Sequence, residues 1–491
     1  MFATRIPRLL FAEALCVVIL PVTLNADEPF IPFPDDALQP PYIETLMLTE
    51  EKDSADAKPA DAKPDDPLDA RFKSLEDELK KLKASLEKKP EPKKEEKPVI
   101  VYPTVKVTGF FQADAGWFHQ DAASIAHFAT VPPTAPSGDI QDDRGFRRAR
   151  LAAVGSVNEN TKYMLEMDFA FNGRPSFMDV WMEVANLTSL GNVRIGQFRQ
   201  PFGLDELTSV KELTFLERPL MFGMGPFRQI GVQVADISKD ENSTYAMSIF
   251  GGGTDPWGDS IGDRGYGGAA RVTKVLMEDC CGDFLVHGGL GYVHQQTPNS
   301  FIQYRNVPEY GGPFLPTAIA PGSLIAAGSV PFFVDTGPMA AENANLVNAE
   351  LAGTWGSVHA QSELRYAMVN TKAGGTIAFP SFYAQAGWIL TGEHRPYNKQ
   401  SAALGRIKPK SVAGAKCGGS GAWELAVRYS WMDFNQGGIA GGELTNMTYG
   451  INWYLNDYTK LQFNYIDADL DTPAVGPANT DIFAMRAQLD F

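Results

Sequence analysis

The sequence predicts an all-β body, a transmembrane antiparallel β-barrel of about sixteen strands, preceded by a short coiled-coil helix. Three observations lead to this fold class. Segment after segment alternates apolar and polar residues with a period of two, as half-buried strands do. No stretch after Val99 approaches the roughly 20 consecutive apolar residues that a membrane-spanning helix needs. The connections between these segments are short and long in turn, which is typical of a barrel in a membrane.

The composition agrees with a folded, β-rich chain and argues against one class of partner. The 491 residues include 46 glycines, and 11% of them are aromatic. Lysine and arginine number 43 against 59 aspartates and glutamates, which gives a net charge of −16. A nucleic-acid partner is therefore not expected, because neutralising phosphates requires a basic face.

The four cysteines do not indicate a disulfide framework or a zinc site, because they are few and irregularly spaced. Cys16 lies in the N-terminal leader. Adjacent Cys280 and Cys281 are expected as free thiols in a turn, and the state of Cys417 is left open. No cofactor is expected.

Residues 1–26 are typical of a signal peptide. Arg5 and Arg8 precede an apolar run that Glu13 interrupts, and Leu24-Asn25-Ala26 resembles a signal-peptidase site. The pattern predicts export with cleavage near Ala26. Residues 27–66 are rich in Pro, Ala, Asp and Lys, a composition that cannot bury a core and indicates a disordered linker.

Residues 67–89 carry an a/d heptad pattern, which predicts a coiled coil. Its apolar positions are Leu68, Phe72, Leu75, Leu79, Leu82 and Leu86. A helix this short is marginal alone, so the pattern implies oligomerisation supported by another interface. A single amphipathic helix lying on another surface is the alternative. Residues 90–103, rich in Lys, Glu and Pro, form a second linker.

The body, residues 104–491, is predicted to be the outer-membrane barrel. In residues 423–432, for example, Trp423, Leu425 and Val427 alternate with Glu424, Ala426 and Arg428. A soluble sandwich also alternates, but the outward aromatic residues and the unequal connections favour a membrane barrel. The expected strands are 105–118, 145–157, 161–171, 176–187, 191–199, 228–236, 243–250, 264–275, 283–294, 346–355, 357–368, 380–393, 420–434, 443–455, 458–468 and 481–491.

Two long segments and the last strand differ from the regular pattern of strands and turns. Segment 394–419 is long where a short turn is expected. Segment 295–345 is interpreted as either a lid or a disordered outer loop. The last strand ends on Phe491, which resembles the C-terminal signature of bacterial outer-membrane barrels, although an ordinary edge strand is the alternative.

Three motifs resemble the phosphate-selective porin O/P family. They are Arg-Gly-Phe-Arg-Arg-Ala-Arg-Leu at 144–151, Ile-Gly-Gln-Phe-Arg-Gln-Pro-Phe-Gly-Leu-Asp at 195–205, which continues to Phe-Leu-Glu-Arg-Pro-Leu at 215–220, and Gly-Trp-Ile-Leu-Thr-Gly-Glu-His-Arg-Pro-Tyr at 387–397. The resemblance covers residues 104–491. It implies a trimeric sixteen-strand porin, with a coiled-coil N-terminal extension in some members.

Inward arginines are the candidate pore residues, because an anion crossing a low-dielectric wall needs fixed positive charge along its path. Loop 200–227 is the candidate constriction and contributes one lysine and one arginine. The full set is Arg144, Arg147, Arg148, Arg150, Arg194, Lys211, Arg218, Arg271, Arg365 and Arg428. The alternative is that these residues pair with lumen acids and only hold the wall rigid. Those acids include Glu166, Asp168, Glu183, Glu363 and Glu424.

The leading hypothesis is an outer-membrane porin for passive diffusion of small hydrophilic solutes, especially anions such as phosphate. Its expected partners are these solutes, outer-membrane lipid and two further copies of the chain. The alternative is a structural tether, whose coiled coil contacts periplasmic envelope components while the barrel serves as the anchor. An enzyme is not expected, since none of the six histidines lies in a visible Ser/His/acid arrangement. Asp467, Asp469 and Asp471 are interpreted as a solvated outer loop rather than a calcium site.

Overall fold

The computed structural model describes residues 67–87, 101–131, 134–170, 175–188, 191–253, 265–280, 282–297, 300–312, 317–320, 323–325, 330–414 and 418–491. The chain divides into two units, residues 1–95 and 96–491. The predicted signal peptide, the linker 27–66, most of the linker 90–103, Cys281 and Cys417 lie outside the described residues. Cys280 is exposed in the connection that follows β8.

Helix α2 (Pro67–Glu87) occupies the range in which the heptad pattern predicts a coiled coil. Phe72, Leu75 and Leu79 are 62%, 57% and 59% exposed, so the single chain leaves this apolar seam uncovered. No helix among the described residues combines the length and hydropathy needed to cross a membrane.

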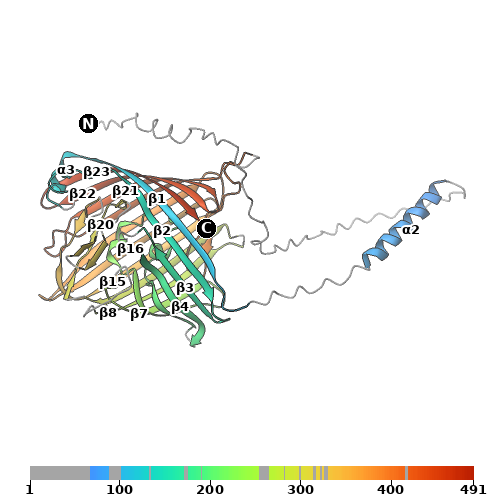
Figure 1. Cartoon of the computed structure of the whole chain (residues 1–491), viewed down its shortest axis with the longest axis horizontal. Helices are drawn as coiled ribbons and strands as arrows, with labels where there is room; N and C mark the ends of the chain where they lie inside the picture. The colour runs from blue at the N-terminus through green and yellow to red at the C-terminus, as the bar shows by residue number, and fades with distance from the viewer. Residues whose placement is uncertain are drawn as a thin grey trace. The chain divides into compact units, whose positions relative to one another are not determined.

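The second unit is a closed antiparallel barrel (Figure 1). Among the described residues sixteen long strands form its wall. They are β1 (Lys106–Gln120), β2 (Asp143–Ser156), β3 (Thr161–Asp168), β4 (Ser176–Thr188), β5 (Gly191–Arg199), β6 (Arg228–Ile237), β7 (Ser243–Gly251), β8 (Tyr266–Glu278), β9 (Phe284–Gln296), β15 (Met339–Trp355), β16 (Val358–Thr371), β17 (Thr376–Ile389), β20 (Ala422–Asp433), β21 (Glu443–Asn456), β22 (Thr459–Thr472) and β23 (Gly476–Asp490).

Closure is made by the first and last strands of the wall. β1 pairs with β2 on one side and with β23 on the other, and Phe111 lies opposite Leu489. The backbone N–H groups of Gly109 and Phe491 each donate to the other's carbonyl, at 2.9 and 3.0 Å. β23 is therefore paired along both edges, and the edge-strand alternative is wrong.

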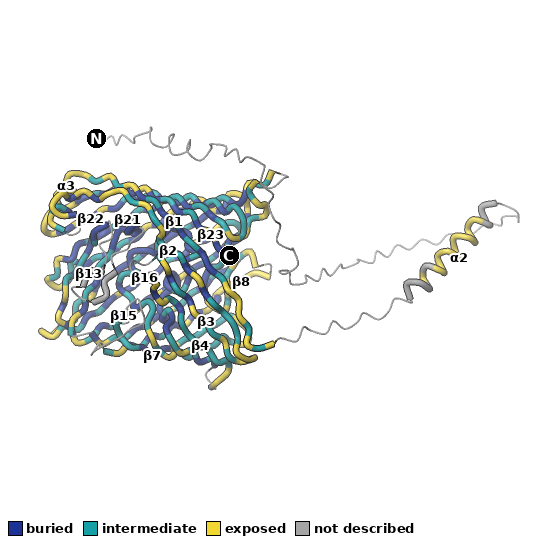
Figure 2. Tube along the Cα trace, in the orientation of Figure 1, coloured by how far each residue is buried: buried dark blue, intermediate teal, exposed yellow. Residues whose placement is uncertain are grey.

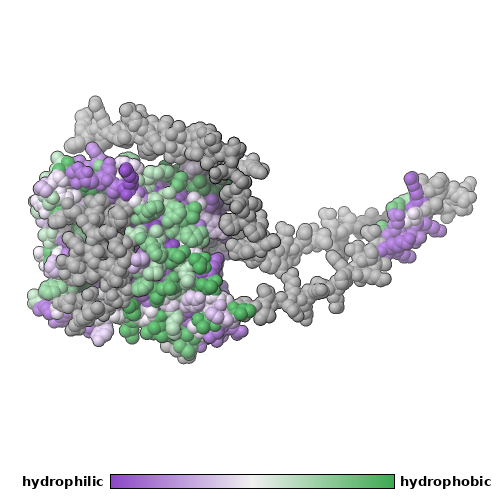
Figure 3. Space-filling model, viewed as in Figure 1, coloured by the Kyte–Doolittle hydropathy of each residue, from purple (hydrophilic) through white to green (hydrophobic). Residues whose placement is uncertain are grey.

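The predicted alternation is present along the wall (Figure 2). On β20, Arg428 points inward and is 2% exposed, whereas its neighbours Val427 and Tyr429 are 41% and 39% exposed. Outward aromatic residues also pack with one another: the rings of Trp423 and Trp453 stack with centroids 4.9 Å apart. The part of the wall visible in Figure 3 is largely hydrophobic, and hydrophilic residues gather at its upper left, near α3. This is the surface that a lipid bilayer requires.

The connections differ between the two ends of the barrel. One end has tight turns, such as 157–160, 356–357 and 457–458, which we assign to the periplasm. The other end has the long connections 121–142, 200–227, 252–265 and 297–338 and is assigned to the extracellular side. The long segment 390–421 lies among the tight turns, as the sequence indicates, and it does not continue the wall.

Seven short strands and three short helical segments lie in the described parts of these connections. They are α3 (Ala122–Phe128), α4 (Leu204–Leu207), η2 (Leu220–Met224), β10 (Phe301–Ile302), β11 (Arg305–Asn306), β12 (Thr317–Ala320), β13 (Ser323–Ile325), β14 (Val334–Asp335), β18 (Tyr397–Asn398) and β19 (Ala403–Leu404).

The three aspartates expected in an outer loop are placed differently. Asp467, Asp469 and Asp471 occupy alternate positions of β22, on its outward side. The Asn479 amide donates to Asp467 and Asp469 at 2.6 and 2.8 Å. The strand continues further than its apolar pattern suggested because β23 pairs with it as far as Thr472. The part of the chain that the structure describes contains no cluster suited to a metal ion.

Candidate functional site: the lumen of the barrel

Loop 200–227 folds into the barrel and is bound to the far wall, as expected for a constriction. At its start, the carboxylate of Glu363 on β16 accepts hydrogen bonds from the backbone N–H groups of Leu204 and Asp205, both at 2.9 Å. At its end, the N–H of Leu220 donates to Ser430 Oγ at 3.0 Å. Between them, Lys460 Nζ donates to the carbonyl of Leu213 at 3.0 Å. The loop thus crosses the lumen from β5 to strands β16 through β22.

Glu217 is the electrostatic centre of this loop. Its carboxylate lies 3.1 Å from Arg147 Nε, 2.7 Å from Arg148 Nη2 and 2.7 Å from Arg486 Nη2. Arg486 also forms a bidentate pair with Asp114, at 2.7 Å. Burial alone raises the pKa of Glu217, but attraction to the three arginines outweighs it and holds the pKa well below its usual range. The loop and strands β1, β2 and β23 are therefore joined by a single charged cluster.

A cavity of about 140 Å³ lies beside the loop, against the inner faces of β1 to β6. We call it the lysine cavity; its lining includes Phe110, Arg150, Glu166, Asp179, Arg199, Ser209, Lys211 and Arg228. Four basic side chains thus face two carboxylates, and the cavity is net positive. Lys211 Nζ has no ion pair among the described residues and lies 5.9 Å from the centroid of the Phe110 ring.

The other cations of the cavity are held in place. Arg150 Nε donates to Asp168 at 2.8 Å, and Arg228 Nη2 lies 2.6 Å from Asp179. Arg199 instead donates to backbone carbonyls of the loop, including Leu207 at 2.7 Å. Guanidinium groups fixed in this way present their remaining N–H donors in a defined direction, which suits a phosphate or carboxylate oxygen.

The remaining predicted cations are distributed around the lumen. Arg194 pairs with Glu183 at 2.6 Å, Arg271 with Glu350 at 2.6 Å, Arg365 with Glu206 at 2.7 Å, Arg428 with Glu309 at 3.0 Å and Arg218 with Asp205 at 3.7 Å. Arg144 is exposed at the extracellular end of β2. Eight of the ten predicted cations thus form ion pairs with acidic side chains.

Several of the counter-ions are not among the five acids predicted on the strands. Glu206 and Glu217 belong to loop 200–227, and Glu309 belongs to the segment after β11. Of the five predicted acids, Glu166, Asp168 and Glu183 pair with arginines, whereas Glu363 binds the start of the loop. Glu424 binds His359, Asn452 and Tyr454.

Segment 390–421 also enters the lumen, from the periplasmic end. The guanidinium of Arg395 donates to Thr214 Oγ1 and to the carbonyl of Glu212, both at 2.5 Å. Arg406 pairs with the Glu212 carboxylate at 2.7 Å and with Asp490. This segment therefore meets loop 200–227 at mid-barrel, which explains why it is long where a turn would suffice.

The described parts of segment 297–338 place apolar side chains in the buried cluster inside the extracellular half of the barrel. Tyr304, Phe333 and Val334 are buried with inward residues such as Phe379 and Phe434. Phe333 also packs on Phe128 of α3, with ring centroids 4.6 Å apart. Of the two interpretations offered by the sequence, the inward-folded lid fits these residues.

A family model described as phosphate-selective porin O and P matches residues 126–491. The chain belongs to this family. The porin is 26% identical to Porin O of Pseudomonas aeruginosa over 382 residues, which cover 72% of this chain and 84% of that protein. It is 25% identical to an uncharacterized protein of Caulobacter vibrioides over 381 residues, which cover 73% and 71% of the two chains. The trimer form of OmpT from Vibrio cholerae is similar with a TM-score of 0.47 at 11% identity, covering 79% of this chain and 99% of OmpT.

The family match and the closed barrel together identify an outer-membrane porin, a channel for passive diffusion of small solutes. They do not favour the tether alternative. The resemblance drawn from the three arginine- and glycine-containing motifs is confirmed.

Several lumen cations of this porin were missed by sequence reasoning. Arg486 lies on the inward side of β23, and its alternation with Met485 and Ala487 could have revealed it. Arg199 is the last residue of β5 and Arg228 is the first residue of β6, on either side of loop 200–227. The alternation ends there, so it does not predict whether these side chains point into or out of the barrel. Arg395 and Arg406 lie in a segment without periodicity.

Proposed function

We propose that this porin prefers small anions, phosphate among them, and that they bind in the lysine cavity. The observation that carries this proposal is the excess of cations in the cavity lining. It includes Lys211, whose ammonium group forms no ion pair within 4 Å among the described residues and lies over the Phe110 ring. In a low-dielectric lumen such a charge attracts an anion more strongly than it would in water. Arg150, Arg199 and Arg228 supply further donors.

The paired arginines have a different proposed role. Arg147, Arg148, Arg218, Arg365 and Arg428 are each bound by a carboxylate of an inward-folded loop. A buried guanidinium with its counter-ion contributes little net charge to the path of a solute. We propose that these residues fix the shape of the constriction, and that selectivity resides in the lysine cavity.

The test is the reversal potential of the purified full chain in a planar bilayer under a potassium chloride gradient. Lys211→Gln is expected to lower the anion-to-cation permeability ratio by about threefold or more, since one charge at about 8 Å is worth about 2 kcal/mol at an effective dielectric of about 20, before screening. Lys274→Gln is the matched control, because Lys274 is exposed on the outward side of β8. Added phosphate should reduce the chloride current of the parent more than that of Lys211→Gln.

Two results would count against this proposal. A cation-selective parent channel would show that the paired acids dominate the lumen. An equal permeability ratio in the parent and Lys211→Gln would place the selectivity elsewhere. Passive diffusion itself would stand in both cases.

A homotrimer is proposed on the charges that flank the seam of α2. With Phe72 and Leu79 at a positions and Leu75 at d, Arg71 and Glu78 fall at g, while Glu76 and Lys83 fall at e. In a parallel, in-register coiled coil the pairs Arg71–Glu76 and Glu78–Lys83 both attract across the interface. We further propose that residues 1–26 direct export and that the stalk contacts periplasmic envelope components.

A further inference from the structure

Polar side chains on the outward face of β9, β15, β16 and β17 form a hydrogen-bonded network at the extracellular end of the wall. Tyr292 Oη donates to Asn345 Oδ1 at 2.8 Å, and His294 Nδ1 lies 2.9 Å from the same oxygen. Asn343 Oδ1 accepts from the amides of Asn345 and Asn370, at 3.3 and 2.7 Å. Thr376 Oγ1 continues the chain by donating to Asn370 Oδ1 at 2.7 Å. We call these six residues the rim network.

The register of the strands places this network outside the barrel. His294 follows Leu290 and Tyr292 on the same side of β9, and those two residues are 62% and 44% exposed. On β15, Asn345 shares its side with Val347 and with Leu351, which is 54% exposed. Polar groups are costly in hydrocarbon, so a network above this apolar band belongs at the level of the lipid headgroups.

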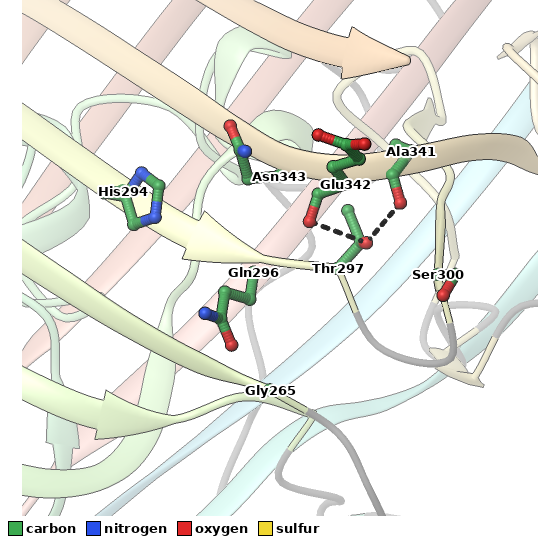
Figure 4. Close-up of a pocket in the computed structure, with 8 residues that line it drawn as sticks. All are labelled: Gly265, His294, Gln296, Thr297, Ser300, Ala341, Glu342 and Asn343. Carbon is green, nitrogen blue, oxygen red and sulfur yellow. Dashed lines mark hydrogen bonds between the residues drawn. The ribbon is translucent and has the colours of Figure 1, made fainter. Parts of the chain in front are cut away.

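A pocket of about 300 Å³ opens beside the network (Figure 4). It is lined by Gly265, His294, Gln296, Thr297, Ser300, Ala341, Glu342 and Asn343. Thr297 Oγ1 fixes one side by donating to the carbonyl of Ala341 at 2.7 Å. The Gln296 amide and the Glu342 carboxylate make no hydrogen bond to other described residues. The volume lies at the lower end of the roughly 300–1,000 Å³ range of small-molecule sites.

We propose that this rim pocket binds a sugar of an outer-leaflet glycolipid. Its lining offers amides, a hydroxyl, an imidazole and one carboxylate, which pair with sugar hydroxyls. Its lining contains no lysine or arginine, and Glu342 repels phosphate. His294 donates from Nδ1 to the network, which leaves Nε2 as an acceptor in the neutral ring. The ring of Tyr292 beneath it suits the boundary between headgroup and acyl chain.

The experiment measures binding of rough lipopolysaccharide to the full chain in a detergent without a sugar headgroup. EDTA is present, so that divalent cations cannot bridge the lipid to outward carboxylates. We expect Gln296→Leu and Asn343→Ala each to weaken binding at least tenfold. Thr445→Ala is the matched control, because Thr445 is an outward polar residue near the same end of β21, and it should bind as the parent does. Deacylated core oligosaccharide should compete with the lipid.

Unchanged reversal potential and heat-modified gel mobility will show that the variants are folded. Equal binding by the parent and both variants would overturn the proposal. Failure of the oligosaccharide to compete would overturn it too, because acyl chains alone would then account for the binding. Equal affinity for phosphatidylglycerol would contradict the proposal, because the sugar would then not be recognised. Loss of the trimer in Gln296→Leu would also contradict it, because this face would then be a contact between subunits.

Discussion

At the scale of single residues, Glu217 shows how a loop carboxylate can organise a cationic lumen. It is the shared counter-ion of Arg147, Arg148 and Arg486, which lie on β2 and β23. Removing a buried carboxylate that lies among three guanidinium groups costs more free energy than removing one partner of a surface ion pair, because it leaves uncompensated buried charge. Glu217 is therefore the charged anchor that ties loop 200–227 to β2 and β23, beside its hydrogen bonds to the other strands.

Glu217→Gln is expected to do two things. It leaves the three arginines with Asp114 as the one carboxylate of the cluster, so the channel should become more anion-selective. Loss of a buried counter-ion should also destabilise the barrel by about 3–5 kcal/mol. Reversal potential and thermal unfolding measure the two effects. Glu183→Gln is the control, since its partner Arg194 is more exposed; equal effects of the two variants would refute the prediction.

The depressed pKa of Glu217 predicts how the channel responds to acid. The ion-pair stabilisation is fully present above the unfolded pKa of about 4.3, and it is lost only as the pH falls through the lower folded value. The contribution of this cluster to the reversal potential should therefore stay constant between pH 7 and pH 5. A step below about pH 4 should be seen in the parent and be absent in Glu217→Gln, as titration in the bilayer would show.

At the scale of elements, the lumen is narrowed from both ends. Loop 200–227 enters from the extracellular side and segment 390–421 from the periplasmic side, and Glu212 of the first accepts from Arg395 and Arg406 of the second. Each segment limits the movement of the other.

Arg406→Gln removes the charged link between these two segments. Segment 390–421 should then move more freely, and single-channel conductance should rise and fluctuate more. The control is Lys410→Gln, because the exposed Lys410 Nζ donates only to the carbonyl of Gly392 in the same segment. Identical conductance traces from the two variants would show that the link does not limit the pore.

The sequence was informative wherever a period of two exists. The alternation predicted where the strands lie. It also predicted the inward orientation that the structure shows for Arg148, Arg150, Arg271, Arg365 and Arg428. It could not identify Glu206 or Glu309 as partners, because the loops that carry them have no period. Their paths depend on contacts with Arg365 and Arg428, which lie 159 and 119 positions away in the sequence. For the same reason segment 390–421 was recognised as unusual in length but not as part of the lumen.

At the scale of the whole molecule, both α2 and the barrel bear on whether the chain assembles into a trimer. A 21-residue helix with an exposed apolar seam is marginal alone, whereas three copies held by a membrane barrel would bring the seams together. The coiled coil and the barrel contacts should therefore support each other.

Exchange of charges across the seam tests this arrangement. Glu78→Lys should weaken the trimer, since it faces Lys83 of the neighbouring copy in a parallel coil, and Lys83→Glu added to it should restore stability. The readout is the temperature at which the trimer dissociates in mild detergent. Failure of the double variant to recover would argue against the parallel register.

The seam between β1 and β23 has a consequence for the order of events in biogenesis. The hydroxyl of Thr108 donates to the carbonyl of Phe491 at 2.7 Å, across 383 positions of sequence. Pairing at such separation is slow, because the whole intervening chain has to be ordered before the two edges can meet. Until then both edge strands expose unpaired backbone groups that invite aggregation. Escort of the unfolded polypeptide across the periplasm is thus a requirement set by the geometry of the ring.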